Sequence, residues 1–226
     1  MALPSYVSGP SSLPLLGQTI GAELDRRTAA TPDALAVVSR HQRIRLTYGQ
    51  LHPLVEQAAR ALLALGVARG DRVGIWAGNC VEWLVVQYAT AKIGAVLVNV
   101  NPAYRRHELG YALGTSGVSV LVAARGFRQT DYLELLGAVA PELAALETIV
   151  LLGEGGPGML GWEDFLELGG PALAGKLEAV QADLDFDDPI NIQYTSGTTG
   201  FPKGATLSHH NILNNGFFVG HGCGYS

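Results

Sequence analysis

The chain has few charged residues, no cluster of basic residues and no long apolar run. The last two absences each exclude a class of protein. Asp, Glu, Lys and Arg make up 15% of its 226 residues, and the formal net charge is −5. A nucleic-acid or anionic-membrane surface needs a concentrated basic patch, and no run of Lys or Arg supplies one here. We therefore expect no nucleic-acid partner.

The amino terminus lacks the features of a targeting segment. The first Arg stands at position 26, and no uninterrupted apolar run reaches the length needed to span a bilayer. We expect no secretory signal, no transmembrane segment and a cytoplasmic protein. Cys80 and Cys223 lie far apart, without another Cys or His at metal-ligand spacing, and we interpret them as free thiols in a reducing compartment.

Apolar residues and glycine are plentiful. Hydrophobic residues make up 48% of the chain, and 29 of the 226 residues are Gly, which indicates many tight turns and close backbone approaches. A chain of this length can bury a sizeable core as one large domain or two small ones.

Short apolar runs alternate with segments of helical periodicity. The expected strands are residues 35–38, 44–47, 72–76, 95–100, 119–123, 147–152, 190–194 and 204–208. One expected helix follows Thr47 and ends at Gly66, and a second begins after Asn79 and runs through Lys92. The others cover residues 108–116, 130–139, 162–180 in two pieces, and the segment after Ser208. The first two strands predict a hairpin, and strands separated by helices predict right-handed crossovers. We expect an α/β fold with a mostly parallel sheet and helices on both faces.

Helix caps are visible at three places. Thr47 and Gln50 have the spacing of a capping box, and Asn79 with Glu82 gives a second signal of this kind. Ser208 can cap the last helix. Pro53 conflicts with the first helix, because it would remove the hydrogen bond to the carbonyl of Gly49. That helix therefore either starts later or is bent.

Residues 153–158, GEGGPG, have the composition of a surface linker. We expect residues 1–152 to form a first α/β subdomain, 153–188 a linker with short helices, and 189–226 the start of a second subdomain.

The segment from Tyr194 to Gly204, YTSGTTGFPKG, has the composition of a phosphate-holding loop. Backbone amides freed by glycines, together with Ser and Thr hydroxyls, can donate converging hydrogen bonds to phosphate oxygens, and Lys203 can neutralise part of their charge. The spacing departs from the Walker A pattern, because Pro202 precedes the lysine and Gly204 follows it. A kinase or GTPase loop and a flexible connector are the weaker alternatives.

The sequence TSGTTGFPKG followed by ATLSHHN resembles the signature loop of the adenylate-forming (AMP-binding) superfamily, which includes acyl-CoA synthetases, luciferases and peptide-synthetase adenylation domains. LTYGQL (46–51), GDRVGIW (70–76), AKIGAVLVNVNPAY (91–104) and SGVSVLV (116–122) support the resemblance in that superfamily's order. The amino-acid sequence around the loop is most similar to those of medium-chain or long-chain fatty-acid CoA ligases. The resemblance covers nearly the whole chain and implies the amino-terminal domain of an acyl-CoA synthetase-like fold.

What the resemblance implies is a two-step ligation. A carboxylate attacks the α-phosphorus of ATP and releases pyrophosphate, and the thiol of coenzyme A then displaces AMP to form a thioester. ATP with Mg²⁺, a fatty or other carboxylic acid and CoA are the implied small molecules. The implied ATP phosphate-binding residues are Thr195, Ser196, Gly197, Thr198, Thr199, Gly200 and Lys203.

The family's adenine-binding motif, magnesium-binding glutamate, ribose-binding aspartate, hinge and adenylation lysine all follow this loop at positions beyond Ser226. We therefore expect an amino-terminal fragment of the ligase, without the carboxy-terminal domain, a complete catalytic set or a metal site, and with little or no activity alone. The alternative is a stand-alone non-catalytic module that binds nucleotide or scaffolds a partner. The sequence leaves acyl chain length and oligomeric state open, a homo-oligomer included.

Three other groups of residues each have a functional interpretation and a simpler structural one. His209 and His210 could form an acid/base or metal pair, but adjacent helical side chains diverge, so we favour helix-start and packing roles. Trp76 and Trp83 could line an acyl tunnel, but core packing is favoured because both lie in apolar segments. The acidic stretch 183–188 could hold a cation, but a solvated loop is favoured.

Overall fold

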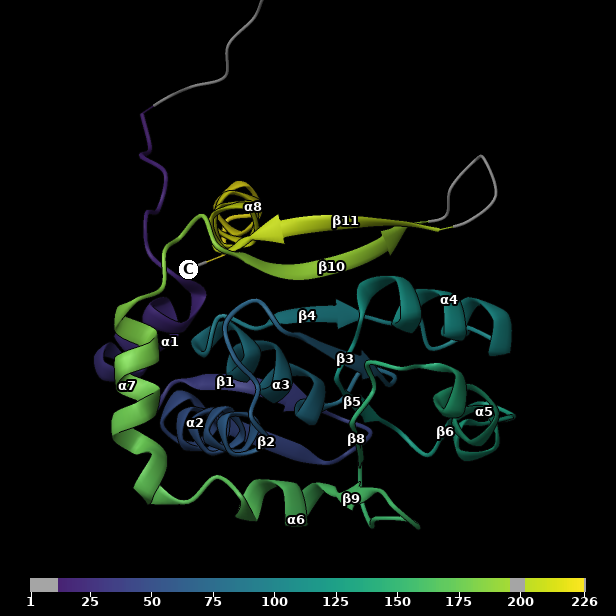
Figure 1. Ribbon diagram of the computed structural model, residues 1–226. Coiled ribbons are helices and arrows are strands. Elements are labelled where there is room, and N and C mark those ends of the chain that lie inside the picture. Colours follow the sequence, from purple (N-terminus) through teal and green to yellow (C-terminus); the bar gives the residue numbers. More distant parts are fainter. Residues whose placement is uncertain (1–11, 196–201, 226) are drawn as a thin grey trace, which may run out of the picture.

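A computed structural model of the chain describes residues 12–195 and 202–225. Within these residues, seven strands form one sheet in the order β11-β10-β4-β3-β5-β8-β9 (Figure 1). These strands are β3 (Arg72–Trp76), β4 (Val96–Asn99), β5 (Val120–Ala123), β8 (Thr148–Leu151), β9 (Leu160–Gly161), β10 (Pro189–Thr195) and β11 (Lys203–Ser208). All neighbours pair in parallel except β10 and β11. The predicted mostly parallel α/β fold is confirmed.

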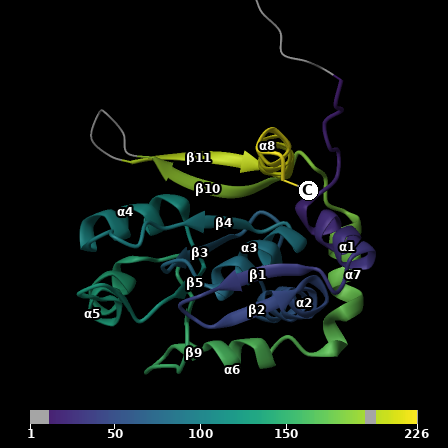
Figure 2. The same ribbon diagram turned by 180° about the vertical axis from the view of Figure 1, so that it is seen from behind.

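Helices cover both faces of this sheet. The helices are α1 (Ile20–Ala30), α2 (Tyr48–Ala64), α3 (Val81–Lys92), α4 (Arg106–Ser116), α5 (Tyr132–Val139), α6 (Trp162–Glu167), α7 (Ala174–Ala182) and α8 (His209–Gly222), with 3-10 turns at Ala140–Glu142 and Pro171–Leu173. Buried residues of α2, α3 and α6 pack on alternate strand residues such as Val73 and Ile75. Buried residues of α4 and α5 pack on the opposite face, against Trp76 and Leu121 (Figure 2). The central strands β3, β4, β5 and β8 are apolar on both faces because each face is covered there.

The predicted hairpin is present as β1 (Leu35–Ser39) and β2 (Ile44–Thr47), a separate antiparallel pair beside α2. Another short pair, β6 (Gly126–Phe127) with β7 (Thr130–Asp131), precedes α5. Thr47 and Gln50 form the predicted capping box, so α2 begins at Tyr48 and does not start later. Pro53 lies inside α2 with an exposed side chain. The buried stripe of α2, from Leu51 to Leu63, offsets the missing hydrogen bond.

The predicted cap at Asn79 is wrong. Cys80 is the N-cap of α3, and its side chain makes no capping hydrogen bond. The backbone N–H of Val81 instead donates to Oε1 of Gln42, at 2.9 Å, from the turn between β1 and β2. The amide of Gln42 also donates to Glu82 at 2.7 Å. A partner some forty residues away has replaced the local cap, and sequence spacing cannot reveal such a partner.

Helix α1 was not predicted. Its N-cap is Thr19, whose hydroxyl accepts a hydrogen bond from the N–H of Ala22, and its buried residues are Ile20, Gly21 and Leu24. The signal was present as a Thr before residues at helical spacing. Of the residues that the structure describes, none belongs to a helix long and apolar enough to cross a membrane.

The segment after residue 153 continues the same sheet. Strand β9 pairs with β8, and α6, the second 3-10 turn and α7 then form the two helical pieces that the pattern predicted. Gly169, between these pieces, packs against α2. A Cβ atom at Gly169 would lie 2.1 Å from the carbonyl oxygen of Gln57. Only a glycine fits this contact without displacing one of the two segments.

Gly169→Ala is therefore expected to lower the free energy of unfolding by about 2–3 kcal/mol, because the added methyl group must push α2 and the turn apart. The adjacent Gly170→Ala is the control, since nothing lies within 4 Å of a Cβ there. Its backbone φ is −58°, which suits alanine. Urea unfolding of both variants measures the difference, and equal midpoints would contradict the close packing.

Candidate phosphate-binding site

Strands β10 and β11 place the two ends of the glycine and hydroxyl loop side by side. Thr195 is paired with Lys203 at the end of their antiparallel ladder. The Thr195 hydroxyl donates to the carbonyl oxygen of Lys203 at 3.3 Å. Five further predicted phosphate-binding residues lie outside the described part of the chain: Ser196, Gly197, Thr198, Thr199 and Gly200. The structure thus positions the first and last members of the predicted set.

The sheet determines where this loop lies. Residues 191–193 of β10 pair in parallel with residues 97–99 of β4, so both strands end at the same edge (Figure 1). In open α/β sheets the crevice beyond the carboxyl ends of the strands is the common ligand position. Thr195 is the last residue of β10, and it delivers the chain to that edge.

A groove of about 550 Å³ lies beside Lys203, between α4 and the β10–β11 pair. Its polar groups are the side chains of Tyr111, Thr115, Ser116, Tyr194, Lys203 and Thr206. No Asp or Glu lines the groove, and Lys203 forms no ion pair with the described residues. Hydroxyls and one unneutralised ammonium make the groove suitable for an anion.

Tyr194 lines this groove and joins β10 to α4. Its hydroxyl donates to the carbonyl oxygen of Ala112 at 3.0 Å, and its ring meets that of Tyr111 edge-on. Burial raises the pKa of Tyr194, so the phenol stays protonated at neutral pH. A neutral donor here adds no negative charge to repel an anion.

An amide network behind the groove fixes β10 against β4 and α3. The side chain of Asn99 donates to Asn191 at 3.1 Å, and Asn191 donates to Gln87 at 3.1 Å. Asn191 is fully buried. Sequence reasoning missed this network, although an Asn inside each of two apolar strands was a visible signal. The network joins the strand that carries the loop to the centre of the fold.

His209 packs at the start of α8, as the simpler interpretation expected. The ring is buried, and its Nδ1 accepts a hydrogen bond from the backbone N–H of Ile20 at 3.1 Å. Burial lowers its pKa to about 4, against the opposing effect of Asp188 and Asp185. An acceptor nitrogen must be unprotonated, so the geometry and the low pKa agree on a neutral ring.

His209 is therefore expected to make folding stability depend on pH. Its folded-state pKa lies below the usual histidine value of 6.5, so its contribution is complete above about pH 6.5 and is lost as pH falls towards 4. The loss amounts to about 3 kcal/mol. Urea unfolding between pH 7 and 4 should show a steeper decline for the wild type than for His209→Gln, which cannot titrate. Parallel declines would contradict this assignment.

The remaining candidates take structural positions. His210 stacks edge-on against Phe186. Trp76 is buried against Tyr132, with ring centroids 3.4 Å apart, and its indole N–H donates to the carbonyl oxygen of Asn101. Trp83 is partly buried beside the core that α2 and α3 share. These positions agree with packing roles.

The acidic stretch 183–188 is more than a solvated loop. Asp188 forms an ion pair with Arg69, and the carbonyl oxygen of Asp183 accepts a second hydrogen bond from the same guanidinium. These contacts anchor the segment that leads into β10. Both cysteines are free in the structure, and burial raises the pKa of the Cys80 thiol to about 11.

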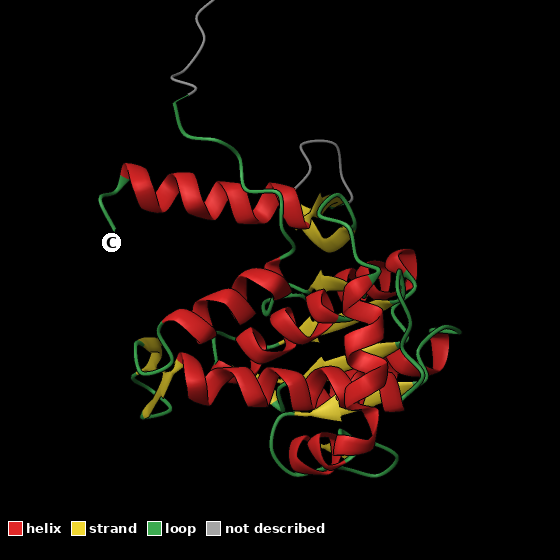
Figure 3. Ribbon diagram, turned by 90° about the vertical axis from the view of Figure 1, so that its left-hand side faces the viewer, coloured by secondary structure: helices red, strands yellow, loops and turns green. Residues whose placement is uncertain are grey.

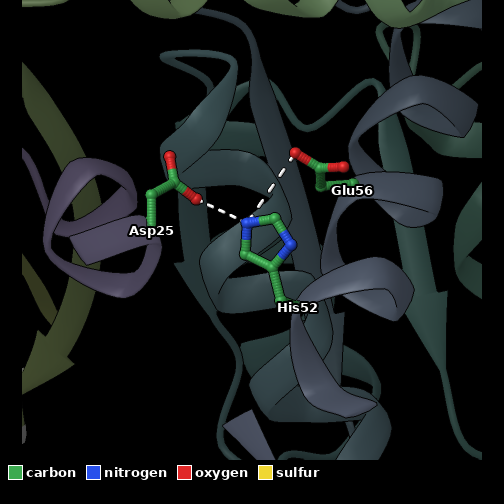
Figure 4. Close-up of side chains that lie close together, drawn as sticks. All are labelled: Asp25, His52 and Glu56. Atoms are coloured by element: carbon green, nitrogen blue, oxygen red, sulfur yellow. Dashed lines mark hydrogen bonds and ion pairs between the residues drawn. The ribbon is translucent and has the colours of Figure 1, made fainter. Parts of the chain in front are cut away.

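One group of potential metal ligands occurs among the described residues. Asp25, His52 and Glu56 place their ligand atoms within 4.8 Å of one another (Figure 4). The ammonium of Lys92 already lies 2.5 Å from the Asp25 carboxylate and 3.7 Å from Glu56. Because Lys92 is fully buried, this arrangement is a lysine held between helices, and its positive charge stands where a cation would bind.

Comparison with known proteins adds the following findings. The family described as AMP-binding enzyme matches residues 24–224. A medium-chain acyl-CoA ligase of Danio rerio, the mitochondrial ACSF2, is 40% identical over an alignment of 235 residues. The alignment covers 98% of this chain and 39% of the relative. The chain thus spans about two fifths of the length of that curated relative.

Two solved structures share the fold of this chain. The inhibitor-bound amino-terminal domain of FACL13 from Mycobacterium tuberculosis superposes with a TM-score of 0.64 at 28% identity, over 85% of this chain and 44% of that one. The long-chain-fatty-acid-CoA ligase FadD1 from Archaeoglobus fulgidus gives a TM-score of 0.78 at 22% identity, over 98% of this chain and 43% of that one. The second likeness supports the fold alone.

Proposed function

Because the chain belongs to the AMP-binding enzyme family, we propose that it forms the amino-terminal part of an ATP-dependent fatty-acid CoA ligase. In the proposed reaction, a carboxylate oxygen attacks the α-phosphorus of ATP, and the bond to pyrophosphate breaks. The CoA sulfur then attacks the acyl carbonyl, and AMP leaves. The Danio rerio relative is described as a medium-chain acyl-CoA ligase, which supports a fatty acid as the substrate class.

The observation that carries this proposal is the loop between Thr195 and Lys203. The paired strands hold both loop ends at the edge where β4 and β10 end, beside a groove without carboxylates. We propose that the hydroxyls and amides of residues 195–200 bind the β- and γ-phosphates of ATP. Lys203 then stabilises the charge that develops on the leaving pyrophosphate. Positioning and charge stabilisation are the contributions that phosphoryl transfer requires of a protein.

The described residues do not complete the proposed site. Mg²⁺ accompanies ATP in such reactions and prefers carboxylate and phosphate oxygens. No Asp or Glu lines the groove beside Lys203, so these residues do not fit a protein-held magnesium site there. We propose that residues 189–226, from β10 to α8, begin a second subdomain, because α8 extends beyond the sheet with Phe217, Phe218 and Val219 exposed (Figure 3).

The test is a chimeric ligase in which this chain replaces the matching segment of the Danio rerio relative. The proposal expects fatty-acid-dependent exchange of pyrophosphate into ATP, with octanoate and palmitate as substrates and the unaltered relative as control. A folded chimeric ligase without exchange would contradict the proposal.

The 226-residue chain alone is expected to form no acyl-CoA, since its described residues hold one side of the proposed site. Thioester formation by the purified chain would contradict this expectation. Retained ATP binding by the chain, together with a folded but inactive chimeric ligase, would favour the stand-alone module. A cytoplasmic location remains a prediction, because the Danio rerio relative is mitochondrial by name.

A further inference from the structure

An apolar pocket of about 300 Å³ opens between the β1–β2 hairpin and helices α2, α3 and α6. Its walls include Ile44, Leu54, Val85, Trp162 and Leu166. Helix α6 follows β9, which is the sheet edge opposite β11. In Figure 1 these elements lie at the other end of the molecule from β10 and β11. The pocket is therefore separate from the groove beside Lys203.

Three carboxylates line this apolar pocket, and no Lys or Arg does. They belong to Glu82 of α3 and to Glu163 and Glu167 of α6. Across the described ranges 12–195 and 202–225, none of the three forms an ion pair. The amide that donates to Glu82, from Gln42, is neutral. The pocket thus combines apolar walls with three negative charges that no described cation neutralises.

Contacts between the helices hold the pocket walls in place. The side-chain amide of Gln57, on α2, donates to the carbonyl oxygen of Leu166 at 3.1 Å. The guanidinium of Arg60, one turn further along α2, donates to the carbonyl oxygen of Gly169 at 2.9 Å. The tight contact of Gly169 with Gln57 joins the same two segments. A ligand would therefore enter a pocket that exists before binding, which lowers the entropic cost of association.

We propose that this pocket binds a lipophilic cation, an amine with an apolar body of about ten carbon atoms. The apolar body fills the space between Trp162 of α6 and Leu54 and Val85 of α2 and α3, and the ammonium faces the three carboxylates. Opposite charges attract, and the attraction is modest because Glu163 and Glu167 are exposed to water. ATP, CoA and a fatty carboxylate are all anions, and the same charges repel them. The ligand class thus lies outside the reaction proposed above, and the site would regulate or localise the protein.

Binding of 4-phenylbutylamine to the 226-residue chain tests the proposal. The uncharged 4-phenylbutanol and the anionic 4-phenylbutyrate have nearly the same shape and separate charge from apolar contact. Titration is followed by the indole N–H resonance of Trp162, which is identified by its loss in Trp162→Phe. The amine is expected to bind with a Kd on the order of 0.1–1 mM. The alcohol should bind at least about fivefold more weakly, and the carboxylate most weakly. Equal binding of all three, or preference for the carboxylate, would overturn the proposal.

The carboxylates are tested by the triple variant Glu82→Gln/Glu163→Gln/Glu167→Gln. It is expected to weaken amine binding about tenfold and to leave alcohol binding unchanged, because it removes charge and preserves shape. Unchanged amine affinity would overturn the assignment. These side chains lie at the pocket and not in the sheet, and a thermal melt of the variant checks that folding is intact.

The matched control is Glu134→Gln/Glu147→Gln/Glu178→Gln, which changes the net charge equally at exposed glutamates outside the pocket. It should leave amine binding unchanged, and an equal loss would show a general charge effect and overturn the proposal. Leu54→Trp fills the pocket and should abolish binding of amine and alcohol alike. A lysine-containing apolar peptide that shifts the Trp162 signal while the amine does not would assign the surface to a protein partner and overturn the small-ligand proposal.

Discussion

Lys203→Ala is expected to slow pyrophosphate exchange by the chimeric ligase about 10²- to 10³-fold, the usual effect of removing one group that stabilises transition-state charge. Lys203 is exposed at the first position of β11 and is the one cation that lines the groove of described residues next to the loop. Its loss removes charge from the site where, in the proposed reaction, pyrophosphate leaves. The rate constant should fall more than the affinity for ATP, because the charge develops fully in the transition state.

The control for this variant is Lys176→Ala. Lys176 is also exposed, and its ammonium donates to the carbonyl oxygen of Leu63 at 3.5 Å. It should leave exchange unchanged. Thr198→Ala, within the same loop, should slow exchange in the same direction as Lys203→Ala. Unfolding midpoints of all three variants should match that of the parent. Normal exchange in Lys203→Ala would remove the proposed role of this residue.

Lys92→Met is expected to lower the free energy of unfolding by about 1–3 kcal/mol, less than for a fully buried pair, because the Asp25 side chain that loses the ammonium is 42% exposed. The ammonium of Lys92 contacts Asp25 of α1 and Gln181 of α7, and it lies 3.7 Å from Glu56 of α2. One buried charge on α3 therefore joins four helices. Methionine fills the space of the stem, so the expected loss arises from the carboxylates left without their counter-charge.

The pH dependence of Lys92→Met distinguishes charge from packing. Burial alone would raise the pKa of Asp25, but the hydrogen bonds from His52 and Lys92 outweigh it, so the pKa falls below the usual aspartate value of 3.8. The stabilisation is therefore complete above about pH 3.8 and is lost as pH falls through the lowered folded value. The difference between wild type and Lys92→Met should shrink below pH 4 in urea unfolding.

Two further variants complete this measurement. Lys176→Met is the control, and it should change stability by less than about 1 kcal/mol because that lysine is exposed. Asp25→Asn combined with Lys92→Met should cost less than the sum of the single changes, since neither charge is then left alone. A pH-independent difference with additive costs would assign the loss to packing instead.

Local patterns predicted most secondary structure correctly. The capping box at Thr47, the cap at Ser208, the hairpin of residues 35–47 and the alternation of strands with helices are all present. Each depends on residues within a few positions of one another, so sequence spacing carries the required information. The cap at Asn79 failed because the donor of α3 found Gln42, which no local pattern indicates.

The candidate site, too, was predicted only in part from the sequence. Composition and spacing predicted a phosphate site in the loop from Thr195 to Lys203 and distinguished its sequence from the Walker A pattern. The groove beside Lys203 and the amide network of Asn191 could not be predicted, because their members are separated by some eighty to one hundred residues. Contacts of this kind form only when strands from distant segments are paired.

By itself, therefore, the sequence predicted a loop suited to phosphates, and it determined the α/β alternation and the resemblance to the adenylate-forming enzymes that the family match bears out. Backbone periodicity and the donor groups of a short loop are local properties, and local residues encode them. The tertiary structure decided which charges meet. It buried Lys92 between Asp25 and Glu56, left Lys203 beside a groove without an ion-pair partner among the described residues, and placed three glutamates around an apolar pocket at the opposite end. Those arrangements depend on packing between elements far apart in the chain, where the balance of burial and charge is set.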